Sequence, residues 1–326
     1  MKRRIGWIAL AVLGTACTSG SPSVLDPKGR SAERVEGLWW LMLWISVAVL
    51  AVVVGMMAVA IARRRTREAE PRRDPPRWGG PFVAIAGVFV PVLVLTGVYV
   101  LSLRQLQAIT RDDATLEIDV IGHVWWWEAR YPNGAVTANE IHLPVGEPVR
   151  IRLSTADVIH SFWVPQLGPK IDMIPGRTNQ LVLEATEPGR YRGQCAEFCG
   201  LQHANMAFFV VAEPRVDFET WAADMAAPAR SPSTVEERRG LQVFLGSTCV
   251  GCHTIRGTEA TAELGPDLTH LATRETIAAG TLPLTERALA RWITAPQDVK
   301  PGAVMPPTEL TPEELDVLVT YLRSLR

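Results

Sequence analysis

The sequence CAEFCGLQHANM at residues 195–206 places two thiols, an imidazole and a thioether within one short segment. A second imidazole, His160, lies upstream. Thiolate, imidazole and thioether groups together form the ligand set that suits copper. The two cysteines are spaced so that they could bridge two metal ions rather than hold one. The segment, together with His160, therefore indicates a copper site.

Two other sites would use the same residues. A zinc ion takes two cysteines and two histidines, although zinc gains nothing from Met206 and zinc fingers usually pair these ligands differently. A disulfide between Cys195 and Cys199 is also permitted, because this region is expected to lie outside the membrane in an oxidising compartment. The full pattern favours copper, and both alternatives stay open.

A second motif, Cys249-Val250-Gly251-Cys252-His253, has the C-x-x-C-H spacing of covalent haem attachment. Its two thiols would add across the haem vinyl groups, and His253 would be carried under the iron as an axial ligand. The motif alone is only moderately specific. Helical apolar spacing over residues 235–244 precedes it, and a Thr-Pro start signal opens a predicted final helix over residues 311–325.

Two long apolar runs account for the positive mean hydropathy of +0.11 in this 326-residue chain. Residues 37–62 and residues 79–103 contain no charged side chain. Each run exceeds the roughly 20 residues that a helix needs to span a bilayer. Pro91 lies inside the second run, where neighbouring helices can satisfy the freed backbone groups. Residues 37–111 therefore predict a transmembrane hairpin.

The connection between the two runs is rich in arginine, which places it on the cytoplasmic side by the positive-inside rule. Everything from about residue 104 onward would then lie on the outer face of the cell membrane, periplasmic or extracellular. The basic excess of the chain belongs to this membrane segment, so it gives no support for a nucleic-acid partner. The arginines concerned are Arg63, Arg64, Arg65, Arg67, Arg72, Arg73 and Arg77.

The N-terminus has the pattern of a secretory signal. Three basic residues precede an apolar stretch over residues 5–16 that is too short to span a membrane. Cys17 follows Gly14-Thr15-Ala16, which resembles a bacterial lipoprotein signal except that Gly14 stands where an apolar residue is usual. Residues 1–17 are thus predicted to be a signal peptide, with a lipid anchor at Cys17, and residues 18–36 a polar linker.

Residues 112–216 predict a domain of short strands, because apolar and polar residues alternate with period two and turn signals separate the stretches. Many short strands with regular turns indicate a β-sandwich or a Greek-key barrel. The chain is therefore predicted to be a multidomain membrane protein with a β domain outside the membrane. The expected strands include residues 115–121, 148–153, 179–184 and 207–212.

The pattern H…C-x-E-x-C-x-x-x-H-x-x-M, which ends in residues 195–206, resembles the binuclear CuA copper site of cytochrome c oxidase subunit II. The resemblance implies a cupredoxin fold for residues 112–216. It implies that Cys195 and Cys199 bridge two coppers and that His160 and His203 each ligate one. Met206 and the backbone carbonyl of Glu197 would be weak ligands.

Two further residues take roles from the same resemblance. The Glu197 carboxylate would help to hold a magnesium ion at the boundary with subunit I. Trp125 matches the tryptophan through which electrons reach the copper, within an aromatic surface cluster; core packing is the alternative. Successive residues of a strand point to opposite faces, so Trp125 and Trp127 are expected on one face and Trp126 in the core.

Residues 234–326 resemble a class I cytochrome c domain, which is all-α. Met305, followed by two prolines, would be the sixth iron ligand, with an ordinary core methionine as the alternative. A Met/His ligand pair raises the haem potential. Between the two domains, residues 217–233 form a helix-like piece and a small, Pro-rich segment. That composition predicts a semi-flexible linker, which would keep the haem near Trp125.

The resemblance spans the hairpin, the copper domain and the haem domain, as in the caa type of bacterial haem–copper oxidase. It implies an electron-input subunit that passes electrons from an upstream respiratory donor, through haem c and CuA, to oxygen-reducing haems in subunit I. Proton pumping and a subunit III would accompany it. The two spans contain no histidine, so this chain alone would perform no oxygen chemistry.

Two alternatives to this function stay open. The CuA subunit of a haem–copper nitric oxide reductase would have the same parts, because the partner sets the substrate. A free-standing membrane electron-transfer module is the other alternative. The two-helix hairpin argues against it, since one lipid or one helix would suffice as an anchor.

Overall fold

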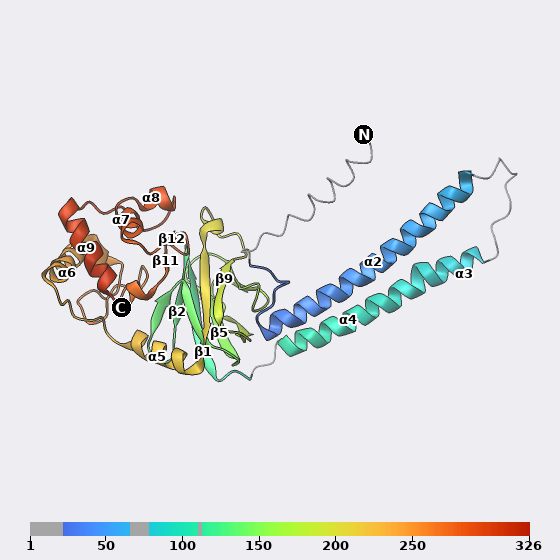
Figure 1. Cartoon of the computed structure of the whole chain (residues 1–326), viewed down its shortest axis with the longest axis horizontal. Helices are drawn as coiled ribbons and strands as arrows, with labels where there is room; N and C mark the ends of the chain where they lie inside the picture. The colour runs from blue at the N-terminus through green and yellow to red at the C-terminus, as the bar shows by residue number, and fades with distance from the viewer. Residues whose placement is uncertain (1–21, 66–77, 110–112) are drawn as a thin grey trace.

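The computed structural model describes residues 22–65, 78–109 and 113–326. Figure 1 shows a helical hairpin, a β domain and a helical C-terminal domain in sequence along the long axis of the molecule. The predicted signal peptide, Cys17 and most of the arginine-rich connection lie outside the described residues. The domain order is the one expected from the sequence.

The hairpin contains two apolar helices that lie side by side (Figure 1). The first, α2, spans Arg30–Arg65, and the second begins as α3 (Gly79–Ala84) and continues as α4 (Val90–Ile109). A π-helical turn, η1 (Ile85–Phe89), joins α3 to α4 directly before Pro91; proline lacks the N–H that a regular helix would use there. By length and composition, both helices could cross a membrane.

The hairpin helices leave large apolar side chains uncovered by protein. Trp44 is 63% exposed and Leu95 is 67% exposed. Such a surface is unfavourable in water, because burial of apolar area is the dominant favourable contribution to folding. Lipid would cover it, which agrees with the predicted spans at residues 37–62 and 79–103.

The predicted linker over residues 18–36 is wrong in its second half, because α2 already begins at Arg30. The preceding segment pairs with the β domain: the Lys28 amide donates to the Gln166 carbonyl (2.7 Å), and the Thr186 amide donates to the Lys28 carbonyl (2.8 Å). Gly29 is required here, since a Cβ would lie 2.6 Å from the Leu167 carbonyl oxygen. We call residues 23–29 the N-terminal clip.

The β domain consists of two five-stranded sheets, with strand orders β3-β2-β1-β5-β8 and β4-β10-β9-β6-β7. Two neighbouring pairs, β1 with β5 and β4 with β10, are parallel, and the others are antiparallel. The β-sandwich prediction is confirmed. The strands are β1 (Leu116–His123), β2 (Trp126–Arg130), β3 (Val136–Ala138), β4 (Glu140–Pro144), β5 (Val149–Thr155), β6 (His160–Trp163), β7 (Ile171–Met173), β8 (Asn179–Leu183), β9 (Gly189–Cys195) and β10 (Ala207–Glu213).

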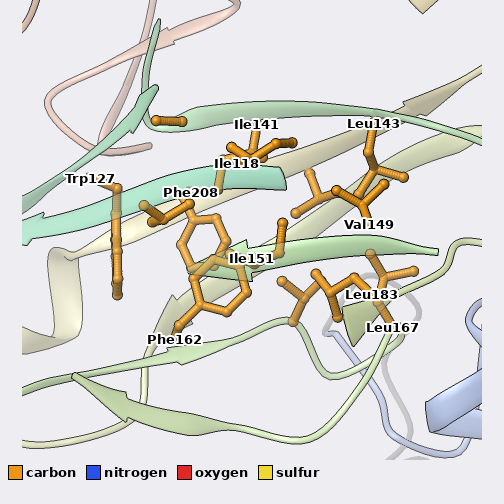
Figure 2. Packing of buried hydrophobic residues seen from close by; sticks show 14 of the residues in the cluster. Ile118, Trp127, Ile141, Leu143, Val149, Ile151, Phe162, Leu167, Leu183 and Phe208 are labelled. Atoms are coloured by element: carbon orange, nitrogen blue, oxygen red, sulfur yellow. The ribbon is translucent and has the colours of Figure 1, made fainter. Parts of the chain in front are cut away.

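Side chains from both sheets fill the space between them (Figure 2). Trp127, Phe162 and Phe208 form an aromatic group at one end, with ring centroids 4.7–6.0 Å apart. Aliphatic side chains such as Ile151 and Leu183 continue the core toward the other end. The aromatic group lies at the end of the sandwich where β6 begins and β9 ends.

The three consecutive tryptophans differ from the prediction. Trp127 is fully buried in the core, whereas Trp126 is only partly buried and stacks on His123 at a centroid distance of 4.1 Å. Trp125 lies in the turn before β2 and is partly buried. The alternation of side chains between the two faces of the strand therefore starts at Trp126, where β2 begins. As a result, Trp127 and not Trp126 occupies the core.

The C-terminal domain is mainly helical, with a two-stranded addition. Helices α6 and α9 pack together, and each begins with a capping box, at Thr234 and Thr311, in which side chain and backbone satisfy each other. The elements are α6 (Val235–Gly246), η3 (Thr248–Gly251), η4 (Leu271–Thr273), β11 (Thr276–Ile277), β12 (Leu282–Pro283), α7 (Glu286–Thr294), α8 (Pro296–Val299) and α9 (Pro312–Ser324).

Helix α5 (Arg215–Ala226) connects the two domains and packs on the β domain. The residues after it contact the C-terminal domain: the Ala229 amide donates to the Arg256 carbonyl (2.8 Å), and the His270 ring lies 3.0 Å from the Ala227 carbonyl oxygen. The predicted linker is thus in contact with the domain that it connects.

Close packing of α6 on α9 depends on Gly240, because a methyl group there would overlap the Val317 carbonyl oxygen. We expect Gly240→Ala to destabilise the C-terminal domain by roughly 3 kcal/mol, since overpacking forces the backbone apart. Faster hydrogen exchange of the α6 and α9 amides would show this loss. Gly246→Ala, in the same helix with open space around it, is the control and should leave exchange unchanged.

Candidate metal and haem sites

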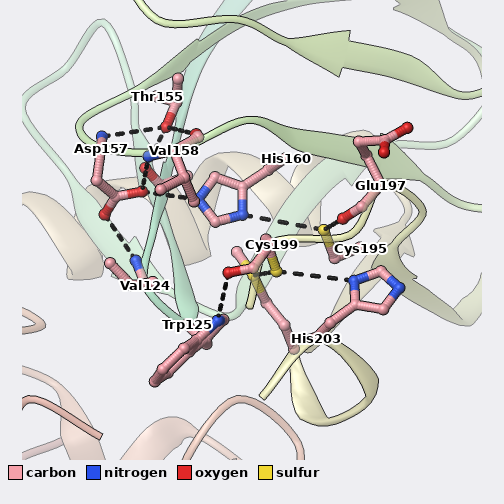
Figure 3. A network of polar contacts seen from close by, with 12 residues as sticks. Val124, Trp125, Thr155, Asp157, Val158, His160, Cys195, Glu197, Cys199 and His203 are labelled. Atoms are coloured by element: carbon pink, nitrogen blue, oxygen red, sulfur yellow. Dashed lines mark hydrogen bonds and ion pairs between the residues drawn. The ribbon is translucent and has the colours of Figure 1, made fainter. Parts of the chain in front are cut away.

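The end of the sandwich brings the predicted copper ligands together (Figure 3). Pairing of β6 with β9 places Phe162 opposite Cys195, so His160 and the cysteine loop meet at one edge. The ligand atoms of His160, Cys195 and Cys199 lie within 4.8 Å of one another, and all three residues are buried. His160 Nδ1 is 3.9 Å from Cys195 Sγ.

The remaining predicted ligands surround this group. His203 Nδ1 lies 3.7 Å from Cys199 Sγ, and Met206 Sδ lies 3.7 Å from the same sulfur. The Glu197 carbonyl oxygen is 3.1 Å from Cys195 Sγ, while its carboxylate points away from the sulfurs (Figure 3). Two thiols, two imidazoles and a thioether facing one point form a donor set that fits copper.

The two thiols strongly perturb each other. Hydrogen bonding from Cys199, assisted by His160, lowers the pKa of Cys195 to about 3 despite burial. The same contact and burial raise the pKa of Cys199 far above its ordinary value. One thiolate is therefore readily available, and a bound cation is needed to make the second.

His160 is oriented by a carboxylate that sequence reasoning missed. Its Nε2 lies 2.9 Å from Asp157 Oδ1, which leaves Nδ1 directed at the sulfurs. Burial opposes protonation of His160, but the contacts with Asp157 and Cys195 outweigh it and raise the pKa. Carboxylates behind a histidine ligand fix its tautomer and ring orientation. An acidic residue three positions before the histidine was the available signal.

Asp157 is itself held in place. Its carboxylate accepts hydrogen bonds from the amides of Val124 and Val158, each at 2.7 Å. Burial favours the neutral acid, but these bonds and the contact with His160 lower the pKa of Asp157. Gly122 allows the close approach, because a Cβ there would lie 2.8 Å from His160 Cδ2.

A cavity of about 340 Å³ lies at the contact of the C-terminal domain with the β domain, and the C-x-x-C-H motif and Met305 line it. Cys249, Cys252 and His253 lie on it together, with Met305 from a distant part of the chain. The sequence motif and the predicted sixth ligand therefore reach the same cavity, as a haem requires.

Two contacts fit this cavity to a haem. The His253 Nδ1 lies 2.8 Å from the Pro266 carbonyl oxygen, which leaves Nε2 available for iron, and burial lowers the pKa of His253 so that the ring stays neutral. Arg274 also lines the cavity, and its buried Nε has no partner among the described residues. A haem carboxylate would satisfy such a guanidinium.

Trp125 lies between the two sites. Its ring lines the cavity, and its Nε1 donates a 2.8 Å hydrogen bond to the Cys199 carbonyl oxygen (Figure 3). One glycine from each domain lies close to this ring: Cβ atoms at Gly200 and Gly302 would lie 3.2 Å and 3.5 Å from it. Trp127, which is enclosed in the core, has no comparable position.

The other three histidines in the described residues contact neighbouring protein groups. His123 lies 3.0 Å from Glu128, and His142 stacks on Trp221 with a centroid distance of 3.9 Å. His270 contacts the connecting segment. Asp172, on β7, is exposed.

The fold and sites define a membrane-associated electron-transfer protein with a copper-type and a haem-type site. Residues 134–213 match the family "Cytochrome C oxidase subunit II, periplasmic domain", and residues 237–326 match "Cytochrome c". Cytochrome c oxidase subunit 2 of Alkalihalophilus pseudofirmus is 36% identical over 314 residues, which cover 93% of this chain and 91% of that protein. The subunit of Bacillus sp. (strain PS3) is 32% identical over 340 residues, which cover 97% and 95%.

Solved structures are also similar. The crystal structure of the periplasmic domain of subunit II of the Bradyrhizobium japonicum cytochrome oxidase is 32% identical in sequence, with a TM-score of 0.34. The match covers 36% of the present chain and 99% of the Bradyrhizobium japonicum domain. The chain belongs to the cytochrome c oxidase subunit 2 family. It is a subunit of a cytochrome c oxidase, an oxidoreductase, and associates with other subunits of that complex. Its β domain implies copper and its C-terminal domain implies haem.

We expect Asp157→Asn to weaken copper binding about 10- to 100-fold, the usual effect of losing the group behind a metal ligand. The neutral amide no longer stabilises the orientation of the His160 ring. Competition with a copper chelator would measure the affinity. Asp119→Asn, at an exposed position on β1, is the control, and equal affinities for the two variants would contradict this role of Asp157.

Proposed function

We propose that this chain is the electron-input subunit of a cytochrome c oxidase that carries covalent haem c and a binuclear CuA centre. Electrons from an upstream respiratory donor would reach the haem, pass by Trp125 to the coppers, and continue to the oxygen-reducing site of subunit I. Proton pumping in the complex would be coupled to this flow. The position of Trp125, in contact with both the haem cavity and the Cys199 backbone, carries the proposal.

The residues have distinct tasks in this proposal. Cys195, Cys199, His160, His203, Met206 and the Glu197 carbonyl would hold the copper centre, which would supply one-electron chemistry when bound. Cys249 and Cys252 would attach the haem covalently, and His253 and Met305 would hold its iron. The copper site and the haem site are separate because each predicted ligand set belongs to a domain with its own hydrophobic core.

The hairpin would anchor the chain in the bacterial cell membrane as a multi-pass protein, with both soluble domains on the outer face. Two helices of sufficient length support the hairpin, and the arginine-rich connection supports the orientation. Subunit I would share a magnesium ion through the Glu197 carboxylate, which points away from the thiols. Subunit III and a lipid at Cys17 are further parts of this proposal.

Isolation of the complex from native membranes tests the partner directly. Co-purification with an oxygen-reducing haem subunit is expected. A nitric-oxide-reducing partner, or no partner, would contradict the oxidase assignment.

Met305→Leu tests the iron ligand. The haem should stay attached, because Cys249 and Cys252 form the covalent bonds, but its reduction potential should fall, because the thioether that raises it is lost. Redox titration and the sulfur-to-iron absorption band measure this. Met225→Leu, a similar change at a buried position on α5, is the control; an unchanged potential in the Met305 variant would exclude Met305 as a ligand.

Trp125→Phe tests the route between the sites. Haem-to-copper transfer should slow several-fold while both metal spectra stay unchanged, because the indole provides coupling and the hydrogen bond to Cys199 but no ligand. Flash-induced kinetics on the assembled complex would measure the rate. Trp126→Phe is the matched control, since Trp126 also lines the cavity but stacks on His123. A wild-type rate in the Trp125 variant would place the route elsewhere.

A further inference from the structure

Lys300 is buried at the contact between the two domains. It follows α8 in the C-terminal domain and is only 3% exposed. Its ammonium donates to three backbone carbonyl oxygens: Trp125 at 2.7 Å, Asn205 at 2.8 Å and Ala278 at 3.2 Å. The first two belong to the copper domain and the third to its own domain.

The number of partners matches the chemistry of the group. A lysine ammonium has three N–H donors and no acceptor, and lysine is almost never fully buried unless it is paired. Burial lowers the pKa of Lys300 to about 7, because water no longer solvates the charge. The three carbonyl oxygens take the place of that water.

The three carbonyls lie next to residues of both candidate sites. Trp125 contacts Cys199 through its ring, and Asn205 directly precedes the predicted ligand Met206. Lys300 itself lines the haem cavity. Its position thus connects the turn at Trp125, the copper loop and the haem domain.

The loop that supplies the third carbonyl is unusual. Ala278 and Ala279 have φ angles of 54° and 57°, a left-handed conformation that residues with a Cβ rarely adopt. The Ala278 carbonyl faces Lys300, and the Ala279 carbonyl accepts a hydrogen bond from the Ala207 amide of the copper domain (3.2 Å). The strained backbone therefore presents two consecutive carbonyls to the interface.

The charged pairs between the domains are more exposed. In the Arg130–Glu263 pair, the side chains are 44% and 74% exposed, and in the Arg190–Glu275 pair they are 27% and 69% exposed. Solvent-exposed ion pairs contribute little to stability. By comparison, the three hydrogen bonds of the buried Lys300 ammonium fix its position strongly. Removal of the ammonium leaves the three carbonyl oxygens unpaired.

We propose that Lys300 is a positioning residue that holds the haem domain against the copper domain with Trp125 between the two sites. The inference rests on the proposed function, because positioning matters only if electrons cross this contact. The docking itself and the electron route can be tested separately.

The first test uses the complete chain in its complex, loaded with copper and haem. In Lys300→Met, amides near residues 205–207 and 275–280 should exchange roughly tenfold faster than in the wild type, since loss of one charged hydrogen-bond network corresponds to about a decade in an equilibrium. Arg287→Met, an exposed basic position on α7, is the control. Wild-type exchange in the Lys300 variant would overturn the proposal.

The second test is the transfer rate. Lys300→Met should slow haem-to-copper transfer roughly tenfold, with unchanged copper and haem spectra. Faster exchange with a wild-type rate would overturn the positioning role, and so would altered metal spectra, which would indicate damage to a site. If Lys300→Met slows transfer but Trp125→Phe does not, Lys300 positioning stands and the Trp125 route fails.

Amine labelling of the wild-type complex tests the contact without a variant. A buried Lys300 should be labelled much more slowly than the exposed Lys170. An exposed Lys300 would react like Lys170, so protection from labelling reports burial of the amine. Labelling of Lys300 at the rate of Lys170 would overturn the proposal.

Discussion

Two buried thiols that cannot both ionise without a cation are the constraint around which the β domain is organised. Cys195 and Cys199 lie in one buried group with His160, and a second negative charge beside the first is strongly disfavoured. The sheets restrain the loop that carries them: β9 ends at Cys195, β10 begins at Ala207, and the two strands pair. Both ends of the loop are thereby fixed, and metal binding completes it.

The contact between the domains shortens the path between two sites that the sequence separates widely. In the proposed electron route, coupling falls steeply with distance, so a ring in contact with both candidate sites would favour transfer. Trp125 reaches this position because it lies in the turn before β2, where the strand no longer determines its direction. The glycines on either side leave room for the ring, and Lys300 bonds to its backbone carbonyl.

Features that depend on a short stretch of residues could be predicted from the sequence. The apolar runs, the C-x-x-C-H motif and the cysteine loop each lie within a short segment of sequence, and in the structure the predicted ligand residues of each site lie together. Features that depend on register or on distant partners were not. Which tryptophan enters the core depends on where β2 begins, and Lys300 gains its role only from neighbours far along the chain. Asp157 lies close to His160 in the sequence, but the Val124 amide that helps to hold it is distant.

The N-terminal clip has a mechanical consequence. The copper domain continues directly from α4 in sequence, and through the clip it is also bonded to the residues that begin α2, where Arg30 pairs with Glu184 at 2.7 Å. A domain attached at one point can rotate freely about that point. A domain attached at two points can rotate only about the line that joins them. With these two attachments, the hairpin restricts rotation of the copper domain to that one axis.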